Sequence, residues 1–351
     1  MPYRFKINEP VEKGFRRIAR EQLDASLAEL AGPQIDASGI HECRKALKRL
    51  RSLVRLASGA IGNAKAARRT KALGEIAKLL SAQRDQTVML ETISKLSEDV
   101  PDAAAALAPL RTSLAAHAGN QPAAFDEDTA VRARLLLLQE AKKFARMQFS
   151  KRGFAALEGG LEKSYRQARK ATKYAYDEPT DENFHNLRKA VQWHWRQMSL
   201  LARAWPDEFA VRVSAARELS QLLGDDHDLA VLAGAASAAA DMTAEQKEAA
   251  VGLCQRQQQI LRASAEFRAK RLFAETPDAF VKRMSAYWRY SRSLDPRVEV
   301  PSTSARQVAQ TDHEAPAVVD GQVSVPEKRP VPSKPRLATK AVASTASQRR
   351  A

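Results

Sequence analysis

The sequence is poor in the residues on which several protein classes depend. It holds two cysteines, Cys43 and Cys254, far apart and outside any metal-site spacing, which argues against a disulfide scaffold and favours core thiols in a reducing compartment. No run of about eighteen apolar residues occurs, so no membrane span is expected. The start, Met-Pro-Tyr-Arg-Phe-Lys, lacks the apolar stretch of a secretion signal. Together these absences favour a cytoplasmic protein.

Strand signals are also nearly absent, because β-branched runs are few and no stretch alternates between apolar and polar residues. Apolar residues recur instead at helical spacing, which predicts an all-α fold. We expect Ser38 to cap the second helix and Gly224 to end the ninth. The expected helices cover about 11–31, 38–58, 64–83, 86–96, 101–118, 128–152, 154–176, 185–205, 206–224, a segment after Asp228, 243–273 and 277–290.

Cations exceed acids by a wide margin. Lys and Arg number 57 against 41 Asp and Glu, which gives a formal net charge of +16. Such a balance favours polyanionic partners: nucleic acid, inorganic polyphosphate or an acidic surface. Composition alone does not distinguish these three kinds of partner.

The most informative stretch is the helix expected around residues 41–55. At 100° per residue its cations share an arc of roughly 80° opposite an apolar face. Like charges spaced i,i+4 oppose helix formation, so a bound polyanion is one explanation for the arc and a solvated surface is the other. The arc consists of His41, Arg44, Lys48, Arg51 and Arg55, with Lys45 beside it.

Two landmarks of the first half recur in the second. His41-Glu-Cys-Arg-Lys45 matches His185-Asn-Leu-Arg-Lys189, and the stretch 79–88, which contains Arg84-Asp85, matches 222–231, which contains His227-Asp228. The offsets are 144 and 143 residues, in the same order along the chain. A tandem duplication explains both, with a boundary near Gly119-Asn-Gln-Pro122.

These paired motifs, and the closing stretch Arg271–Phe280, resemble the CHAD family over about residues 3–290. The resemblance implies a helical domain over 1–297 whose halves, about 3–120 and 125–290, form two pseudo-symmetric bundles, with basic helices lining a central cavity or groove. It also implies binding of inorganic polyphosphate and association with polyphosphate granules. No cofactor or metal is implied. The expected polyphosphate contacts are His41, Arg44, Lys45, Lys48, Arg49, Arg51, Arg55, Arg84, His185, Arg188 and Lys189.

A phosphate chain offers oxygens on all sides and no bases, so Arg and Lys are the side chains suited to bind it. The second copy of the basic helix departs from the first, because Gln192, Trp193, Trp195 and Ser199 stand where the first has cations. Arg196 and Arg203 restore part of the charge. We therefore expect weaker binding by this helix, with a second basic arc as compensation: Lys163, Arg166, Lys170 and Lys173.

Two alternatives stay open. His194 and His227-Asp228, with a further acid such as Asp295, could form the metal set of a phosphohydrolase of HD type, although Arg84 stands at the position equivalent to His227. Trp193 and Trp195 could stack on bases of single-stranded nucleic acid. The triphosphatase barrel that accompanies many CHAD domains is not expected, because its Glu-x-Glu-x-Lys signature is missing.

The C-terminal segment 298–351 differs in composition from the rest. It has no aromatic residue and no isoleucine, and from residue 301 on it holds eight basic residues and four acids. Such a segment buries too little apolar surface to offset its chain entropy. We expect a disordered basic tail.

Overall fold

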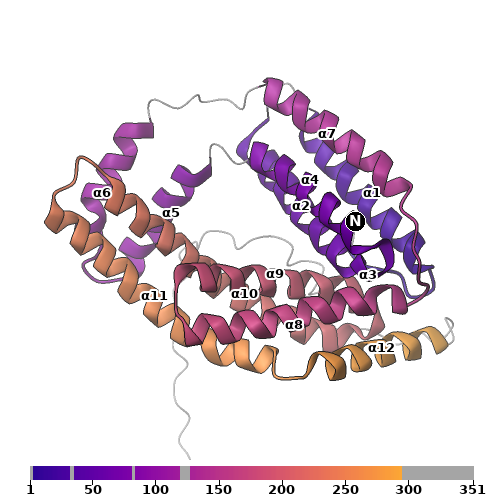
Figure 1. Ribbon diagram of the computed structural model, residues 1–351. Coiled ribbons are helices and arrows are strands. Elements are labelled where there is room, and N and C mark those ends of the chain that lie inside the picture. Colours follow the sequence, from indigo (N-terminus) through magenta and orange to yellow (C-terminus); the bar gives the residue numbers. More distant parts are fainter. Residues whose placement is uncertain (1–2, 32–34, 81–83, 119–126, 295–351) are drawn as a thin grey trace, which may run out of the picture. The chain divides into compact units, whose positions relative to one another are not determined.

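A computed structural model describes the backbone of residues 3–31, 35–80, 84–118 and 127–294. All of them belong to the first of the two units into which the chain divides, Met1–Gln310 and Thr311–Ala351. This part contains twelve α-helices, one short 3-10 helix and no strand, so the all-α prediction is confirmed (Figure 1). The tail from 298 and Asp295 lie outside the described residues.

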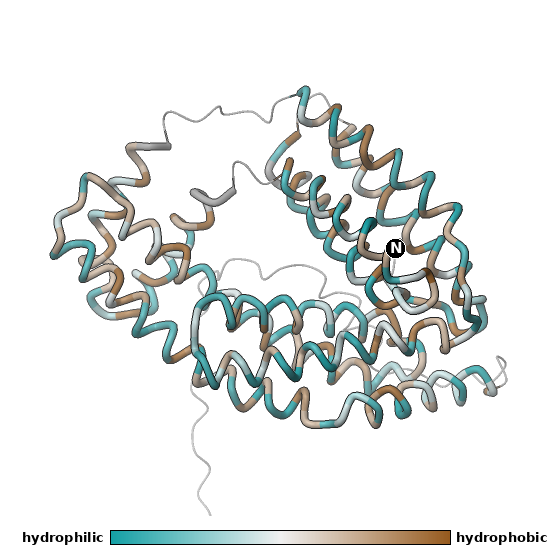
Figure 2. Tube along the Cα trace, in the orientation of Figure 1, coloured by the Kyte–Doolittle hydropathy of each residue, from teal (hydrophilic) through white to brown (hydrophobic). Residues whose placement is uncertain are grey.

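The helices of the first half are α1 (Val11–Glu29), α2 (Ala37–Leu56), α3 (Ser58–Ile61), α4 (Asn63–Leu79), α5 (Arg84–Asp99), α6 (Ala103–Ala118) and α7 (Glu127–Ala145). The second half contains α8 (Ala155–Asp177), α9 (Asp181–Leu201), η1 (Ala202–Ala204), α10 (Pro206–Ala238), α11 (Ala244–Leu272) and α12 (Pro277–Ser293). Along each helix Figure 2 shows apolar and polar residues interleaved, as amphipathic helices require.

Three expected helix ends were wrong. The N-cap of α2 is Asp36, whose carboxylate accepts a hydrogen bond from the Gly39 amide at 2.7 Å, and not Ser38. Helix α7 ends at Ala145, whereas the sequence pattern predicted that it continues to residue 152. Finally, α10 is one helix of 33 residues that continues through Gly224, where two helices were expected. A glycine inside a helix costs only about 1 kcal/mol, which packing along a long helix can offset.

The helices of the two halves begin at matching intervals, in agreement with the predicted duplication. α8 and α9 each begin 144 residues after α1 and α2, and α10 begins 143 residues after α4. The copies then diverge, because the first copy has separate helices α4 and α5 where the second has the continuous α10. The last helices of each set also correspond in their packing, since α7 packs on α1 and α12 packs on α8.

Two hydrophobic cores hold these helices. The larger includes Phe15 of α1, Leu47 of α2, Phe184 of α9 and Trp288 of α12, all 1% exposed or less. The smaller joins α5 and α6 to the second part of α10 and the first part of α11. The described helices therefore do not separate into one bundle for each half of the sequence.

Candidate anion-binding site

The basic arc of α2 contacts the end of α4 near its start and α9 farther along. Near its start, the Arg44 guanidinium donates to the backbone carbonyls of Ala77 and Leu80 at the end of α4, both at 3.4 Å. Farther along, the Ser52 hydroxyl, which lies on the same arc, donates to the Trp193 carbonyl of α9 at 3.4 Å. The C-terminal part of the arc is therefore covered by α9.

Arg55 lies in this covered part, in contact with two helices of the second half. Its Nε donates to the Ser164 hydroxyl of α8 at 3.2 Å, and its guanidinium carbon lies 3.7 Å from the centre of the Trp193 ring. Its Nη2 is buried and has no hydrogen-bond partner within the described residues. Burial, followed by repulsion from Arg51, lowers the pKa of Arg55 to about 10.

Arg196 faces α2 from α9 and is only 7% exposed. It donates to the Gln192 carbonyl at 3.0 Å, and its guanidinium lies 4.4 Å from the centre of the Trp195 ring. The Arg217 guanidinium of α10 lies over the same ring at 5.2 Å. Burial first, and then neighbouring cations with Arg217 among them, lower the pKa of Arg196 to about 10.

Arg51 connects these groups, since its charge acts on both Arg55 and Arg196. Its Nε is buried without a hydrogen-bond partner in the described part of the chain, and burial lowers its pKa. None of these three arginines forms an ion pair with a carboxylate of the described residues. We call the set the arginine cluster: Arg49, Arg51, Arg55, Arg196 and Arg217.

Charges of one sign held together away from water are unfavourable unless an opposite charge joins them. At the α2–α9 crossing the charges are positive, and guanidinium N–H groups remain without acceptors. The arrangement is therefore suited to bind an anion with several oxygens.

A second group of basic side chains lies on α9 and α10: His185 and His227, which we call the histidine pair, with Arg188 beside them. The rings of His185 and His227 lie 4.5 Å apart between centres. Arg188 is next to them, packed against the backbone of α10 at Gly224. The His185 Nδ1 and the Arg188 Nε are buried without hydrogen-bond partners in this part of the structure. Burial, and after it the positive charge of Arg188, lowers the pKa of His227 to about 4. Burial also lowers the pKa of His185.

The histidines of the alternative metal set lie apart. His194 is nine residues beyond His185 on α9, which is about 13.5 Å along the helix axis, whereas His227 contacts His185 itself. His194 packs instead among the rings of Tyr165, Phe273 and Phe280. No group of three metal-binding side chains occurs within the described residues.

The other predicted residues of α2 have varied environments. His41 is half-buried near the start of the helix, and Lys48 is exposed. Lys45 pairs with Glu42 at 3.3 Å. Arg84 begins α5, but its side chain lies outside the described part, as does that of Asp85.

The second basic arc, on α8, does not join the arginine cluster. Arg166 pairs with Glu162 and Lys173 with Asp177, while Lys163 and Lys170 are exposed. The arc is centred roughly 140° around α8 from Ser164, the residue that contacts Arg55. On α9, Lys189 is exposed and donates to the Asn186 side chain at 3.4 Å.

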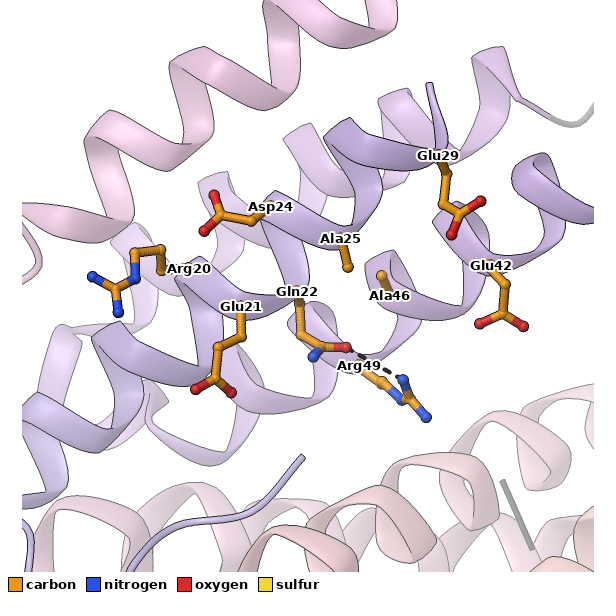
Figure 3. Close-up of a pocket in the computed structure, with 9 residues that line it drawn as sticks. All are labelled: Arg20, Glu21, Gln22, Asp24, Ala25, Glu29, Glu42, Ala46 and Arg49. Carbon is orange, nitrogen blue, oxygen red and sulfur yellow. Dashed lines mark hydrogen bonds between the residues drawn. The ribbon is translucent and has the colours of Figure 1, made fainter. Parts of the chain in front are cut away.

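A pocket of about 640 Å³ lies between α1 and α2 (Figure 3). Arg49 lies at its edge and donates to the Gln22 side chain at 3.5 Å. Four acids line the pocket beside two arginines, so its charge is unsuited to a polyanion. The acids are Glu21, Asp24, Glu29 and Glu42.

Two features of this site could not be read from sequence spacing. Arg217 belongs to α10, whose pattern gives no basic arc, and it reaches the site only because α10 packs on α9. Trp193 and Trp195 interrupt the basic pattern of α9, yet they contact three guanidinium groups of the cluster.

Comparison with known proteins identifies a shared fold and a family. The structure is similar to PptA from Streptomyces chartreusis, with a TM-score of 0.51 and 16% sequence identity over 76% of this chain and 100% of that chain, which shows a shared fold. No curated protein matches the sequence. Residues 17–237, more than half of the chain, match the CHAD domain, and no other domain is found. With its helical fold and its exposed and buried basic arcs, the chain belongs to the CHAD domain family, which is known for binding polyphosphate.

Proposed function

We propose that this protein binds inorganic polyphosphate without catalysis, and that the arginine cluster is its principal contact. One observation carries the proposal: Arg51, Arg55 and Arg196 are buried or half-buried at the α2–α9 crossing and have no carboxylate partner among the described residues. A polyphosphate chain supplies the missing charge, and its oxygens can accept from the buried N–H groups.

The spacing of the two basic groups favours a chain over a single phosphate. Arg188 and Arg196 are eight residues apart on α9, or about 12 Å along its axis. One orthophosphate cannot contact both, whereas a polyphosphate can extend from the arginine cluster to the histidine pair. We propose the remaining cations as weaker contacts along this route: His41, Arg44, Lys45, Lys48, Arg84 and Lys189.

The arc on α8 has a lesser part in this proposal. Two of its four cations are already paired with acids, and the arc is turned away from Ser164. We assign Lys163 and Lys170 to nonspecific attraction, which salt screens readily. A groove lined by α2 and α9, and a location at polyphosphate granules as in other CHAD proteins, complete the proposed role.

We further propose that the domain covers 1–297, although the family match ends at residue 237. The contacts of α11 and α12 with the matched helices support the longer extent. They also favour a repeat boundary after α7, instead of the one expected near 119–122, because α7 packs on α1 as α12 packs on α8.

Nucleic acid is the main competing ligand. Single-strand binders gain affinity when bases stack on aromatic side chains. Here a base would compete with Arg55 for the Trp193 ring, and with Arg196 and Arg217 for the Trp195 ring. This arrangement favours a phosphate chain without bases.

A titration of three ligands at one salt concentration tests the proposal: long-chain polyphosphate, single-stranded RNA and duplex DNA. We expect polyphosphate to bind most tightly. Arg51→Ala with Arg55→Ala should weaken its binding at least tenfold, which is about 1.4 kcal/mol. Arg289→Ala with Arg292→Ala removes the same charge from the exposed surface of α12 and should have little effect. Equal losses from the two double variants would refute a localised site.

A further inference from the structure

The two tryptophans that replace cations in the second copy lie inside the proposed site. By the offset of 144 residues, Trp193 stands at the position of Arg49 and Trp195 at that of Arg51. From sequence alone these replacements remove charge from the second basic helix. In the structure, however, their rings lie under Arg55, Arg196 and Arg217.

The rings are well placed to hold these guanidinium groups. Within the described residues, Arg55 donates one hydrogen bond, to the Ser164 hydroxyl, and Arg196 donates one, to the Gln192 carbonyl. Two hydrogen bonds leave most of the ten guanidinium N–H donors of this pair available. Contact with a tryptophan face then fixes the plane of each guanidinium through cation–π attraction.

An aromatic ring can hold a cation without neutralising it. A carboxylate in the same place would also order the guanidinium, but it would occupy the N–H groups and cancel the charge that attracts phosphate. Arg262 shows that other arrangement in this protein, because it is held by Asp226 at 2.6 Å and by Asp181. Its charge is therefore already satisfied, unlike that of Arg55 or Arg196.

We infer that Trp193 and Trp195 are positioning residues of the polyphosphate site, which hold Arg55 and Arg196 ready while leaving their charge available. This inference rests on the proposed function and adds two uncharged residues to it. It also reverses the expectation that these replacements only weaken the second copy. The same contacts make the site selective, since they occupy ring surface on which a nucleobase would stack.

Substitutions that remove the aromatic ring but keep a large apolar side chain test the inference. Trp193→Leu and Trp195→Leu remove the aromatic face and keep an apolar side chain, so each should weaken polyphosphate binding about three- to tenfold. Trp195→Phe retains a ring and should bind within about twofold of the unchanged protein. Trp205→Leu is the matched control, because Trp205 is 48% exposed and contacts the Tyr287 ring instead of a guanidinium. It should leave binding unchanged.

Tryptophan emission gives a second measurement that needs no change at the site. In a Trp205→Phe protein, the fluorophores are Trp193, Trp195 and the buried Trp288. Polyphosphate that draws the guanidinium groups toward itself should change the emission, saturating at the stoichiometry found by calorimetry. This experiment stays decisive if a leucine variant fails to fold.

The outcomes separate the inference from the proposed function. Leucine variants that fold and bind polyphosphate as tightly as the unchanged protein, with no emission change on binding, would overturn the positioning role even if Arg51→Ala with Arg55→Ala abolishes binding. Loss of affinity in the phenylalanine variant equal to that in the leucine variant would also overturn it. If the unchanged protein does not bind polyphosphate at all, the proposed function itself fails.

Discussion

Removing a buried arginine from the cluster should weaken ligand binding without weakening the fold. Arg196 is the clearest case, because it is 7% exposed and its pKa is lowered from 12.5 to about 10. The folded protein therefore holds the charge of Arg196 less favourably than the unfolded chain does. Below about pH 10 the group is charged in both folded and unfolded states, so the full cost of holding that charge applies at neutral pH.

The magnitude follows from the pKa. A lowering of the Arg196 pKa from 12.5 to about 10 corresponds to roughly 3 kcal/mol of unfavourable charge burial. Arg196→Met retains an unbranched apolar stem but loses the contact with Trp195, about 0.5–2 kcal/mol, and the hydrogen bond to Gln192, about 1 kcal/mol. The free energy of unfolding without ligand should therefore rise by about 0–1.5 kcal/mol. Polyphosphate affinity should fall at least tenfold.

Urea unfolding, with and without polyphosphate, measures both effects. In the unchanged protein the ligand should raise the unfolding midpoint, and in Arg196→Met this increase should shrink. Arg262→Met is the matched control: it leaves Asp226 buried without its cation and should cost about 3–5 kcal/mol. A comparable loss of stability in Arg196→Met would show that Arg196 is a structural residue, and the reasoning from an unsatisfied cluster would be refuted.

Three further perturbations test the surroundings of the site. Burial, then Arg212, lowers the pKa of His194 to about 3, so unfolding takes up a proton and stability should fall as pH drops from 6.5 toward 3. In urea unfolding, a His194→Phe protein should lose the part of this slope that one histidine contributes, while His227 keeps its own part. The pKa of His227 is about 4 in the free protein and should rise beside a bound phosphate. Polyphosphate should therefore bind more tightly as pH falls from 7 to 5, with a proton uptake that calorimetry can measure. The variant His227→Gln should reduce that uptake. The methyl group of Gly160→Ala would lie 2.0 Å from the Leu56 carbonyl oxygen, so this variant should lose about 1–3 kcal/mol of stability and bind more weakly through a displaced Arg55. In the control Gly234→Ala the methyl group meets nothing within 4 Å, and the protein should gain up to about 1 kcal/mol of stability.

Helical periodicity predicted the fold class and most helices, because amphipathic patterns record which face is buried. It could not predict the continuity of α10. Gly224 weakens a helix only slightly, and the outcome depended on the packing of α10 against α9, α11 and α5, which involves residues far away in sequence. Long-range packing also decided where α5 and α6 lie, since their core is completed by α10 and α11.

The charge pattern predicted three of the five members of the arginine cluster, Arg49 among them. Arg51 and Arg55 were expected from their arc on α2, and Arg196 was noted as a partial replacement on α9. Their burial could not be predicted, because it arises where α2 crosses α9. Arg217 joins them through the packing of a third helix, and no local pattern marks it.

The crossing also explains why the two copies of the basic helix differ. If the second copy had kept the first copy's cations, an arginine would stand at position 193, where the Trp193 ring now lies 3.7 Å from the Arg55 guanidinium. Two unit charges about 4 Å apart repel each other by roughly 4 kcal/mol at an effective dielectric constant of 20. That is a large fraction of the stability of a typical domain. A ring at this position replaces repulsion with attraction. The scarcity of cations on α9 therefore allows α2 and α9 to pack against each other while the remaining arginines stay charged.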